Sequence, residues 1–161
     1  MPTTNLWGDE PRSYRLSAGV YAMRDGKAAF LQRAAGVMIG FWIILGGRVD
    51  PYEDPLTAAL SELREESGLE PTGPVEYLCA LPMQGYGEHV LRFFYVTNCD
   101  QGEITLSHEH LDAAWLTPHE YRDRYLNDAE LARWTASHET EGFNVVANRA
   151  WIDALIARLA A

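Results

Sequence analysis

Cysteine is scarce in this chain of 161 residues, which contains only Cys79 and Cys99. Two cysteines so far apart are too few for a zinc cluster, and they predict reduced thiols in strands or in the core. Long hydrophobic runs are also absent, because no window reaches about 18 consecutive apolar residues. The N-terminus has neither the basic region nor the apolar core of a secretion signal. These absences argue against a membrane partner and predict a cytoplasmic location.

Basic residues are few, with 13 Lys and Arg against 23 Asp and Glu, and the net charge is −10. Such a surface disfavours a nucleic-acid polymer as partner. A small phosphate ester remains compatible, because bound metal ions reverse the local charge. Repeats and low-complexity tracts are absent, and 47% hydrophobic residues supply a core. We therefore expect one domain over residues 1–161, with residues 1–12 as a loose lead-in.

The most informative segment, Gly47 to Leu69, contains a short helix with clear ends. Asp54 is followed by Pro55, which is typical of an N-cap with proline at the first helical position. Gly68 stands where a left-handed C-terminal cap is usual. The sequence therefore predicts a helix over residues 55–67.

Three carboxylates share one side of this helix. At 100° per residue, Glu62, Glu65 and Glu66 fall within an arc of roughly 100°. Like charges at this spacing oppose helix formation by about 0.2–0.5 kcal/mol per pair, so a cation is expected among them. Mg²⁺ fits best, because it accepts carboxylate oxygens and recruits substrate phosphates. A solvated acidic face is the plain alternative; a calcium-binding or protein-interaction surface is another, although the alternating Asp and Asn of a calcium loop are missing.

The wider spacing resembles the signature of the Nudix hydrolases, called the box below: glycine, five residues, glutamate, seven residues, then Arg-Glu-apolar-any-Glu-Glu-any-Gly-apolar. The matching residues are Gly47, Glu53, Glu62, Leu63, Glu65, Glu66, Gly68 and Leu69. Ser61 departs from the pattern, which has arginine there, and Leu45 replaces a common proline. Resemblance covers about residues 15–125, including Arg33 at a strand end and the segment Ser107-His-Glu-His110, which is similar to a late segment of several Nudix groups.

This resemblance implies an α+β fold, an α/β/α sandwich with a mixed sheet, and water attack on a phosphorus of a nucleoside diphosphate derivative. Strands are expected over residues 14–24, 27–33, 75–81, 90–97 and 111–116, a helix from Thr117, and a final helix over 144–160 whose buried face includes Ile152, Leu155 and Leu159. Residues 84–88 are expected to form a Gly-rich loop between two strands.

The resemblance also implies roles for the acidic residues. Glu62 and Glu66 are the first choice as ligands of Mg²⁺ or Mn²⁺, and Glu65 is a third ligand, direct or through water. The general base is a box glutamate, Glu62 or Glu65, or else Glu109 from the late segment. Glu53 contacts a metal-bound water or braces the site.

Two glycines and an aromatic residue complete the expected site. A carbonyl from the Gly46 region often ligates metal in this family, and Gly47 permits a tight turn; a plain Gly-Gly turn is the alternative. Trp42 is a candidate for stacking on a base, and Arg33 for meeting a terminal phosphate. Nucleoside triphosphates, dinucleoside polyphosphates and nucleotide sugars are all possible substrates, and exposed strands or the final helix are candidates for pairing two chains into a homodimer.

Ser61, in place of the family's arginine, leads to two functional hypotheses. The family's arginine is expected to hold a box glutamate and nearby backbone, and serine is too short and uncharged to replace it. Arg64 points to the far side of the helix, whereas Arg48 in the preceding loop could serve. Either the enzyme is slower, or the protein binds a nucleotide or metabolite without turnover. Under the first hypothesis, Ser61→Arg is expected to change the rate.

Overall fold

The computed structural model describes residues 13–36, 38–85, 88–136 and 145–161. Their strands are β1 (Arg15–Arg24), β2 (Lys27–Arg33), β3 (Trp42–Ile43), β4 (Leu45–Arg48), β5 (Glu76–Gly85), β6 (Glu88–Asn98) and β7 (His110–Leu116). Their helices are α1 (Pro55–Ser67), α2 (Pro118–Tyr125), α3 (Asp128–Ala136) and α4 (Val145–Ala160). No helix in these ranges is both long and apolar enough to span a membrane.

The strands form one mixed sheet in the order β3-β2-β1-β6-β5, with β4 also paired to β1 and β7 to β2. Only the β1–β6 pairing among these is parallel. Along β1 the neighbour on one side changes, because Ser17 to Val20 pair with β4 whereas Met23 and Arg24 pair with β2. The start of β1 therefore lies beside β4, which leads through a loop into α1.

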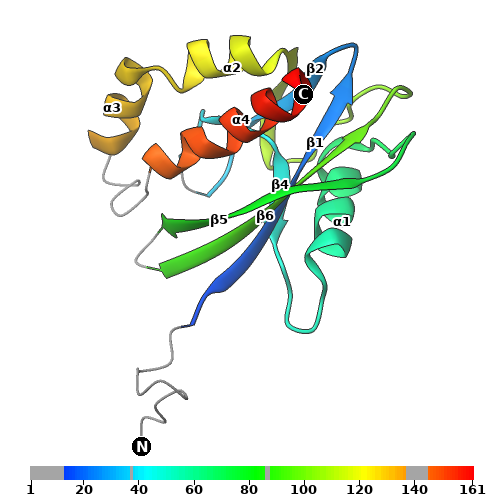
Figure 1. The fold of residues 1–161 in the computed structure, drawn as a ribbon, viewed down its shortest axis with the longest axis horizontal. Helices are drawn as coiled ribbons and strands as arrows, with labels where there is room; N and C mark the ends of the chain where they lie inside the picture. The colour runs from blue at the N-terminus through cyan, green and yellow to red at the C-terminus, as the bar shows by residue number, and fades with distance from the viewer. Residues whose placement is uncertain (1–12, 37, 86–87, 137–144) are drawn as a thin grey trace, which may run out of the picture.

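Helices cover both faces of the sheet (Figure 1). Side chains along β1 alternate between the faces, as the pleat of a strand requires. Tyr21 and Met23 pack in a core with residues of α2, α3 and α4. Ala18 and Val20 pack in a second core with α1. This arrangement confirms the predicted α+β sandwich with a mixed sheet.

Helix α1 has the predicted bounds because both of its caps form. The side chain of Asp54 accepts a hydrogen bond from the Thr57 amide at 2.9 Å. Gly68 adopts the left-handed conformation with φ of 70°, and its amide donates to the Arg64 carbonyl at 2.8 Å. Leu63 is fully buried, so the helix presents its apolar side to the sheet and its box carboxylates to the neighbouring side.

Some elements differ from expectation. Strands β3 and β4 and helix α3 were not predicted from sequence, and β5 and β6 run longer than expected, so that residues 84–85 and 88 belong to strands. Residues 86–87 of the expected loop, residue 144 and the lead-in 1–12 lie outside the described residues. Cys79 in β5 and the buried Cys99 are free thiols, as predicted.

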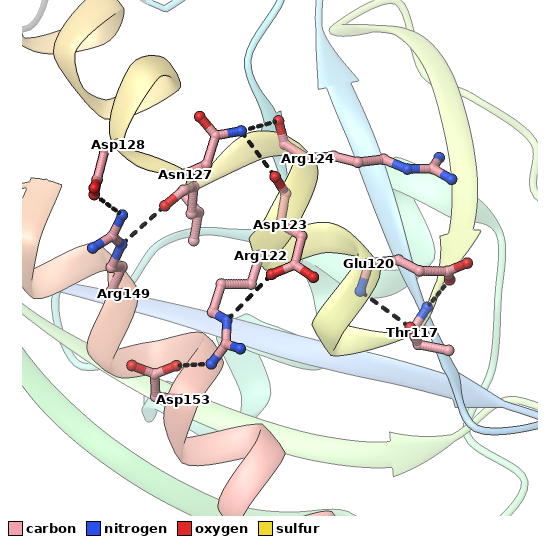
Figure 2. A network of polar contacts seen from close by, with 10 residues as sticks. Thr117, Glu120, Arg122, Asp123, Arg124, Asn127, Asp128, Arg149 and Asp153 are labelled. Carbon is pink, nitrogen blue, oxygen red and sulfur yellow. Dashed lines mark hydrogen bonds and ion pairs between the residues drawn. The ribbon is translucent and has the colours of Figure 1, made fainter.

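Polar contacts hold α4 against α2 and the segment that follows it (Figure 2). Arg122 bonds Asp153 at 3.2 Å. Arg149 donates to the Leu126 carbonyl at 2.9 Å and to Asp128 at 2.6 Å. Inside the core, the Tyr21 hydroxyl donates to the Trp151 carbonyl at 2.9 Å. These contacts fix the place of the Trp151 ring, which stacks nearly parallel to Phe94 with ring centroids 6.1 Å apart.

Thr117 starts α2 with a capping box, and its loss has a measurable cost. The Thr117 hydroxyl accepts from the Glu120 amide at 3.2 Å, and the Glu120 carboxylate accepts from the Thr117 amide at 2.8 Å. Thr117→Ala is expected to lower the free energy of unfolding by about 1 kcal/mol in urea denaturation, whereas Thr117→Ser keeps the hydroxyl and most of the stability. Equal losses in the two variants would rule out the hydroxyl as the cause.

Candidate active site

A cavity of about 630 Å³ opens beside the start of β1, β4 and the carboxylate side of α1. Its acidic group of lining residues is Asp50, Glu53, Glu62, Glu65 and Glu109. Its basic group is Arg15, Arg33, Arg48 and Arg92. Its apolar group is Met38, Phe41, Ile43, Ile44, Met83, Val90, Phe94 and Trp151. Charged and apolar linings in a cavity of this size suit a small ligand with one polar and one flat apolar part.

The acidic group brings together four of the predicted glutamates. Glu62 and Glu65 come from α1, Glu53 from the preceding loop and Glu109 from the loop before β7. Burial raises the pKa of the Glu62 carboxyl, and the negative charges of Glu65 and Glu109 raise it further. Carboxylates that repel one another inside a cavity are arranged for a positive partner.

Glu66, a first choice as metal ligand, lies behind this cavity and is not among the residues that line it. It is 7% exposed, and its Oε2 accepts a hydrogen bond from the Gly46 amide at 3.0 Å. Its Oε1 lies 4.0 Å from Nε2 of His110. Burial raises the pKa of Glu66 to about 8, against the Gly46 hydrogen bond, which lowers it. Glu66 thus braces β4, and its contact with a metal ion stays a prediction.

Pairing of β2 with β7 brings the late segment to the site. Arg33 pairs with His110 after a register shift, and the Ala34 amide donates to the Glu109 carbonyl at 2.8 Å. His110 is buried against Glu66, and burial lowers its pKa. Glu109 is exposed and lines the cavity, whereas the neighbouring His108 does not line it. The structure therefore places Glu109 with the box glutamates, and its role as the general base stays a prediction.

The two box glycines make room for charged groups, whereas the tight turn expected at them is not formed, because both lie in a strand. A Cβ on Gly47 would collide with the Glu62 carboxylate, and one on Gly46 would collide with the Ala18 carbonyl. Both glycines lie in β4 and pair with β1. In the loop that follows, the Asp50 amide donates to the Glu53 carboxylate at 3.0 Å, which holds Glu53 at the cavity.

The arginines lie inside or outside the cavity as the sequence predicts, but one arginine of the cavity was not predicted. Arg64 bonds Glu70 at 2.8 Å and does not line the cavity, as its place on the helix predicts. Arg48 is exposed beside the cavity, and Arg33 lines it. Arg92 was not among the predicted site residues, although an arginine within the apolar run Val90-Leu-Arg-Phe-Phe94 is a signal that could have found it.

Trp42 does not lie where a substrate role requires it. Its ring stacks on Tyr125 of α2, with ring centroids 5.5 Å apart, and it lines a second, smaller cavity. The reason is that β3 pairs with β2 and turns Trp42 toward α2. Phe41, the preceding residue, lines both the main cavity and the smaller one.

The donor chemistry of the acidic group fits a hard divalent cation. Its ligating atoms are carboxylate oxygens, which Mg²⁺ and Mn²⁺ prefer, and no cysteine stands among the described residues that line the cavity. Among the described residues, no three His, Cys, Asp or Glu side chains stand close enough together to hold an ion as they are placed.

Comparison with known proteins agrees with this geometry. A family model, the NUDIX domain, matches residues 13–137. This chain belongs to the Nudix family. Among curated Nudix relatives, the CTP pyrophosphohydrolase of Escherichia coli K12 is 35% identical over 110 residues, covering 67% of this chain and 79% of that protein.

Two further matches agree. The nucleoside triphosphatase NudI of Escherichia fergusonii is 31% identical over 104 residues, covering 58% of this chain and 74% of that one. A MutT Nudix hydrolase structure from Burkholderia pseudomallei superposes with a TM-score of 0.61 and 25% identity, covering 67% of this chain and 86% of that one. The predictions of a Nudix hydrolase and of its fold are therefore confirmed.

Proposed function

We propose that this Nudix protein uses Mg²⁺ or Mn²⁺ to hydrolyse a nucleoside triphosphate between its α- and β-phosphates. The products are a nucleoside monophosphate and inorganic diphosphate. The observation that carries the proposal is one cavity with four glutamates and several arginines in its lining beside an apolar group that includes Phe41 and Trp151. The names of the two curated relatives favour a triphosphate over the dinucleoside polyphosphates and nucleotide sugars that the sequence left open.

The residues divide the chemistry among them. A bound divalent cation would supply Lewis acidity that neutralises charge developing on the phosphate oxygens. Glu62 and Glu65 would hold it, a role supported by the fact that both line the cavity from one helix. Water attacks a phosphorus and the P–O bond to the leaving group breaks, while Glu109 accepts the proton of that water. Arg33 and Arg48, which also line the cavity, contact the phosphates.

The apolar group orients the other end of the substrate. Phe41 is 3% exposed and contacts Trp134 edge to face at 5.2 Å, while Trp151 stacks on Phe94, so both rings are held rigidly by their neighbours. Only a small part of each ring reaches the cavity, where it forms a fixed apolar wall against which a nucleobase can pack at little entropic cost. The base and the phosphates are then held within one cavity.

The test is a panel of nucleoside triphosphates, a dinucleoside tetraphosphate and nucleotide sugars, each incubated with purified protein and Mg²⁺. We expect release of diphosphate from at least one triphosphate, no release in excess EDTA, and a kcat/KM at least about tenfold lower for the other two classes. Because Ser61 stands where the family has arginine, a module that binds a nucleotide without turnover is the second candidate function. Tight calorimetric binding of a methylene-bridged triphosphate, with no turnover of any compound, would overturn the proposal in favour of that candidate.

A further inference from the structure

Arg92 lies within β6, a central strand of the sheet, where it pairs with Ser17 of β1 and Leu81 of β5. Its Nη1 donates to the Ser17 hydroxyl at 2.9 Å, and that hydroxyl donates to the Gly47 carbonyl at 3.0 Å. A guanidinium placed inside a sheet is costly to desolvate and persists only where its surroundings compensate. This chain of hydrogen bonds ties β6 through β1 to the box backbone.

Two glycines reserve the space for the guanidinium. Gly19 and Gly46 pair across β1 and β4. A Cβ on Gly46 would lie 2.5 Å from Nη2 of Arg92, and one on Gly19 would lie 2.8 Å from the same atom. An alanine at either position would displace the guanidinium. The sheet is therefore shaped at this point to admit an arginine from β6.

The guanidinium also faces the carboxylates of α1. Its charge opposes the effect of burial on the pKa of both Glu66 and Glu62, so it stabilises their ionised forms. Ser61, one residue before Glu62, lines the same cavity as Arg92. Position 61 is where the family has its arginine. This position and the guanidinium of Arg92 therefore line the same cavity.

We propose that Arg92 replaces the missing box arginine by holding the Gly47 carbonyl through Ser17. This inference rests on the proposed hydrolysis, for which Arg92 is a positioning residue. It accounts for an intact site despite Ser61. It also changes the expectation for Ser61→Arg, because a second guanidinium would meet the positive charge already in place.

Kinetics of single and double variants test the replacement on the best triphosphate found. Arg92→Ala is expected to lower kcat about 10–100-fold with KM within about threefold, as for residues that orient metal ligands. Ser61→Arg alone should change kcat less than about threefold, yet in the Arg92→Ala background it should restore at least about tenfold. Arg64→Ala, which removes an arginine of the same helix outside the cavity, is the matched control and should stay within about twofold.

Arg92→Lys is the control for a folding defect in Arg92→Ala, because lysine keeps the aliphatic stem and the charge. One ammonium cannot copy the planar fork, so kcat should still fall, by less than in the alanine variant. A tenfold rise in KM with kcat unchanged would make Arg92 a substrate-binding residue and overturn the proposal. Failure of Ser61→Arg to restore kcat in well-folded Arg92→Ala would overturn it as well.

Amide hydrogen exchange separates this inference from the proposed function, because it requires no turnover. In the metal-free protein, Arg92→Ala should speed exchange of the Gly46 amide, which donates to Glu66, by about tenfold or more, and Ser61→Arg should reverse the effect. Arg64→Ala should leave that amide unchanged. If no nucleotide is hydrolysed, this result still supports the positioning role, while unaltered exchange in Arg92→Ala refutes it.

Discussion

Glu62→Gln is expected to lower kcat about a thousandfold while leaving the metal-free protein at least as stable as the wild type. The activity falls because the carboxylate at the centre of the acidic group is lost, beside Glu65 of the same helix and near Glu109. The stability does not fall because an uncharged amide removes both the repulsion from Glu65 and Glu109 and the cost of desolvating a charged carboxylate, the two causes that raise the Glu62 pKa. A large loss of rate without loss of stability is the mark of a site kept for function.

Glu70→Gln is the matched control for this prediction. It makes the same chemical change at an exposed carboxylate that bonds Arg64 and lies outside the cavity. We expect its kcat within about twofold of wild type, since exposed ion pairs contribute little. If Glu62→Gln keeps more than a tenth of the wild-type kcat, the acidic group is not the metal site proposed here.

Loss of stability with rising pH is the second large expected effect, and it comes from Glu66. The usual pKa of a glutamate is 4.5, and burial raises that of Glu66 to about 8 in the folded protein. Between these values the folded state holds a proton that the unfolded state has released. The stability that this proton provides is complete below about pH 4.5 and is lost as the pH rises through about 8.

The charged groups around Glu66 also contribute to the change of stability with pH. Glu62 on α1 also has a raised pKa and adds to the trend, and Glu109 raises that of Glu66 further. Arg92 of β6 acts against it, and His110 of β7, whose pKa is lowered, contributes with the opposite sign near and below its usual value of 6.5. Comparison with a Glu66 variant cancels most of these contributions.

Urea denaturation in EDTA from pH 5 to pH 8 measures the effect. The wild type is expected to lose on the order of 3 kcal/mol relative to Glu66→Gln, because each unit of pKa shift corresponds to about 1.4 kcal/mol. Glutamine keeps the shape of the side chain and an oxygen that can accept from Gly46. Parallel stability curves for the two proteins would contradict the burial of Glu66 behind β4.

The carboxylate helix was predictable to the residue because its signals are local. Asp54, Pro55 and Gly68 define the ends of α1 within the sequence itself, and the structure shows both caps. The glutamate spacing likewise placed Glu62 and Glu65 on the side of α1 that faces the cavity. Patterns within one helical turn needed no knowledge of the rest of the chain.

The parts that were missed depend on distant partners. Strand β4 contains Gly46 and Gly47, which indicate a turn, and it becomes a strand only because residues 17–20 of β1 pair with it. In α4, Leu159 was expected to be buried and is half exposed, whereas Trp151 is buried, because α2 and Tyr21 decide which side of α4 is covered. The apolar neighbours of Arg92 in sequence mark it as unusual, but only the pairing of β6 with β1 shows that it reaches the box.

Phosphorus NMR of the products formed in water enriched in ¹⁸O tests the central claim most directly. With Mg²⁺ and a nucleoside triphosphate, the proposed reaction predicts a nucleoside monophosphate and inorganic diphosphate, one of which carries ¹⁸O from the attacking water. It also predicts no cleavage in EDTA and a rate about a thousandfold lower for Glu62→Gln. Release of orthophosphate with a nucleoside diphosphate would contradict cleavage between the α- and β-phosphates. Cleavage that continues undiminished in EDTA would contradict a metal-dependent reaction at this cavity.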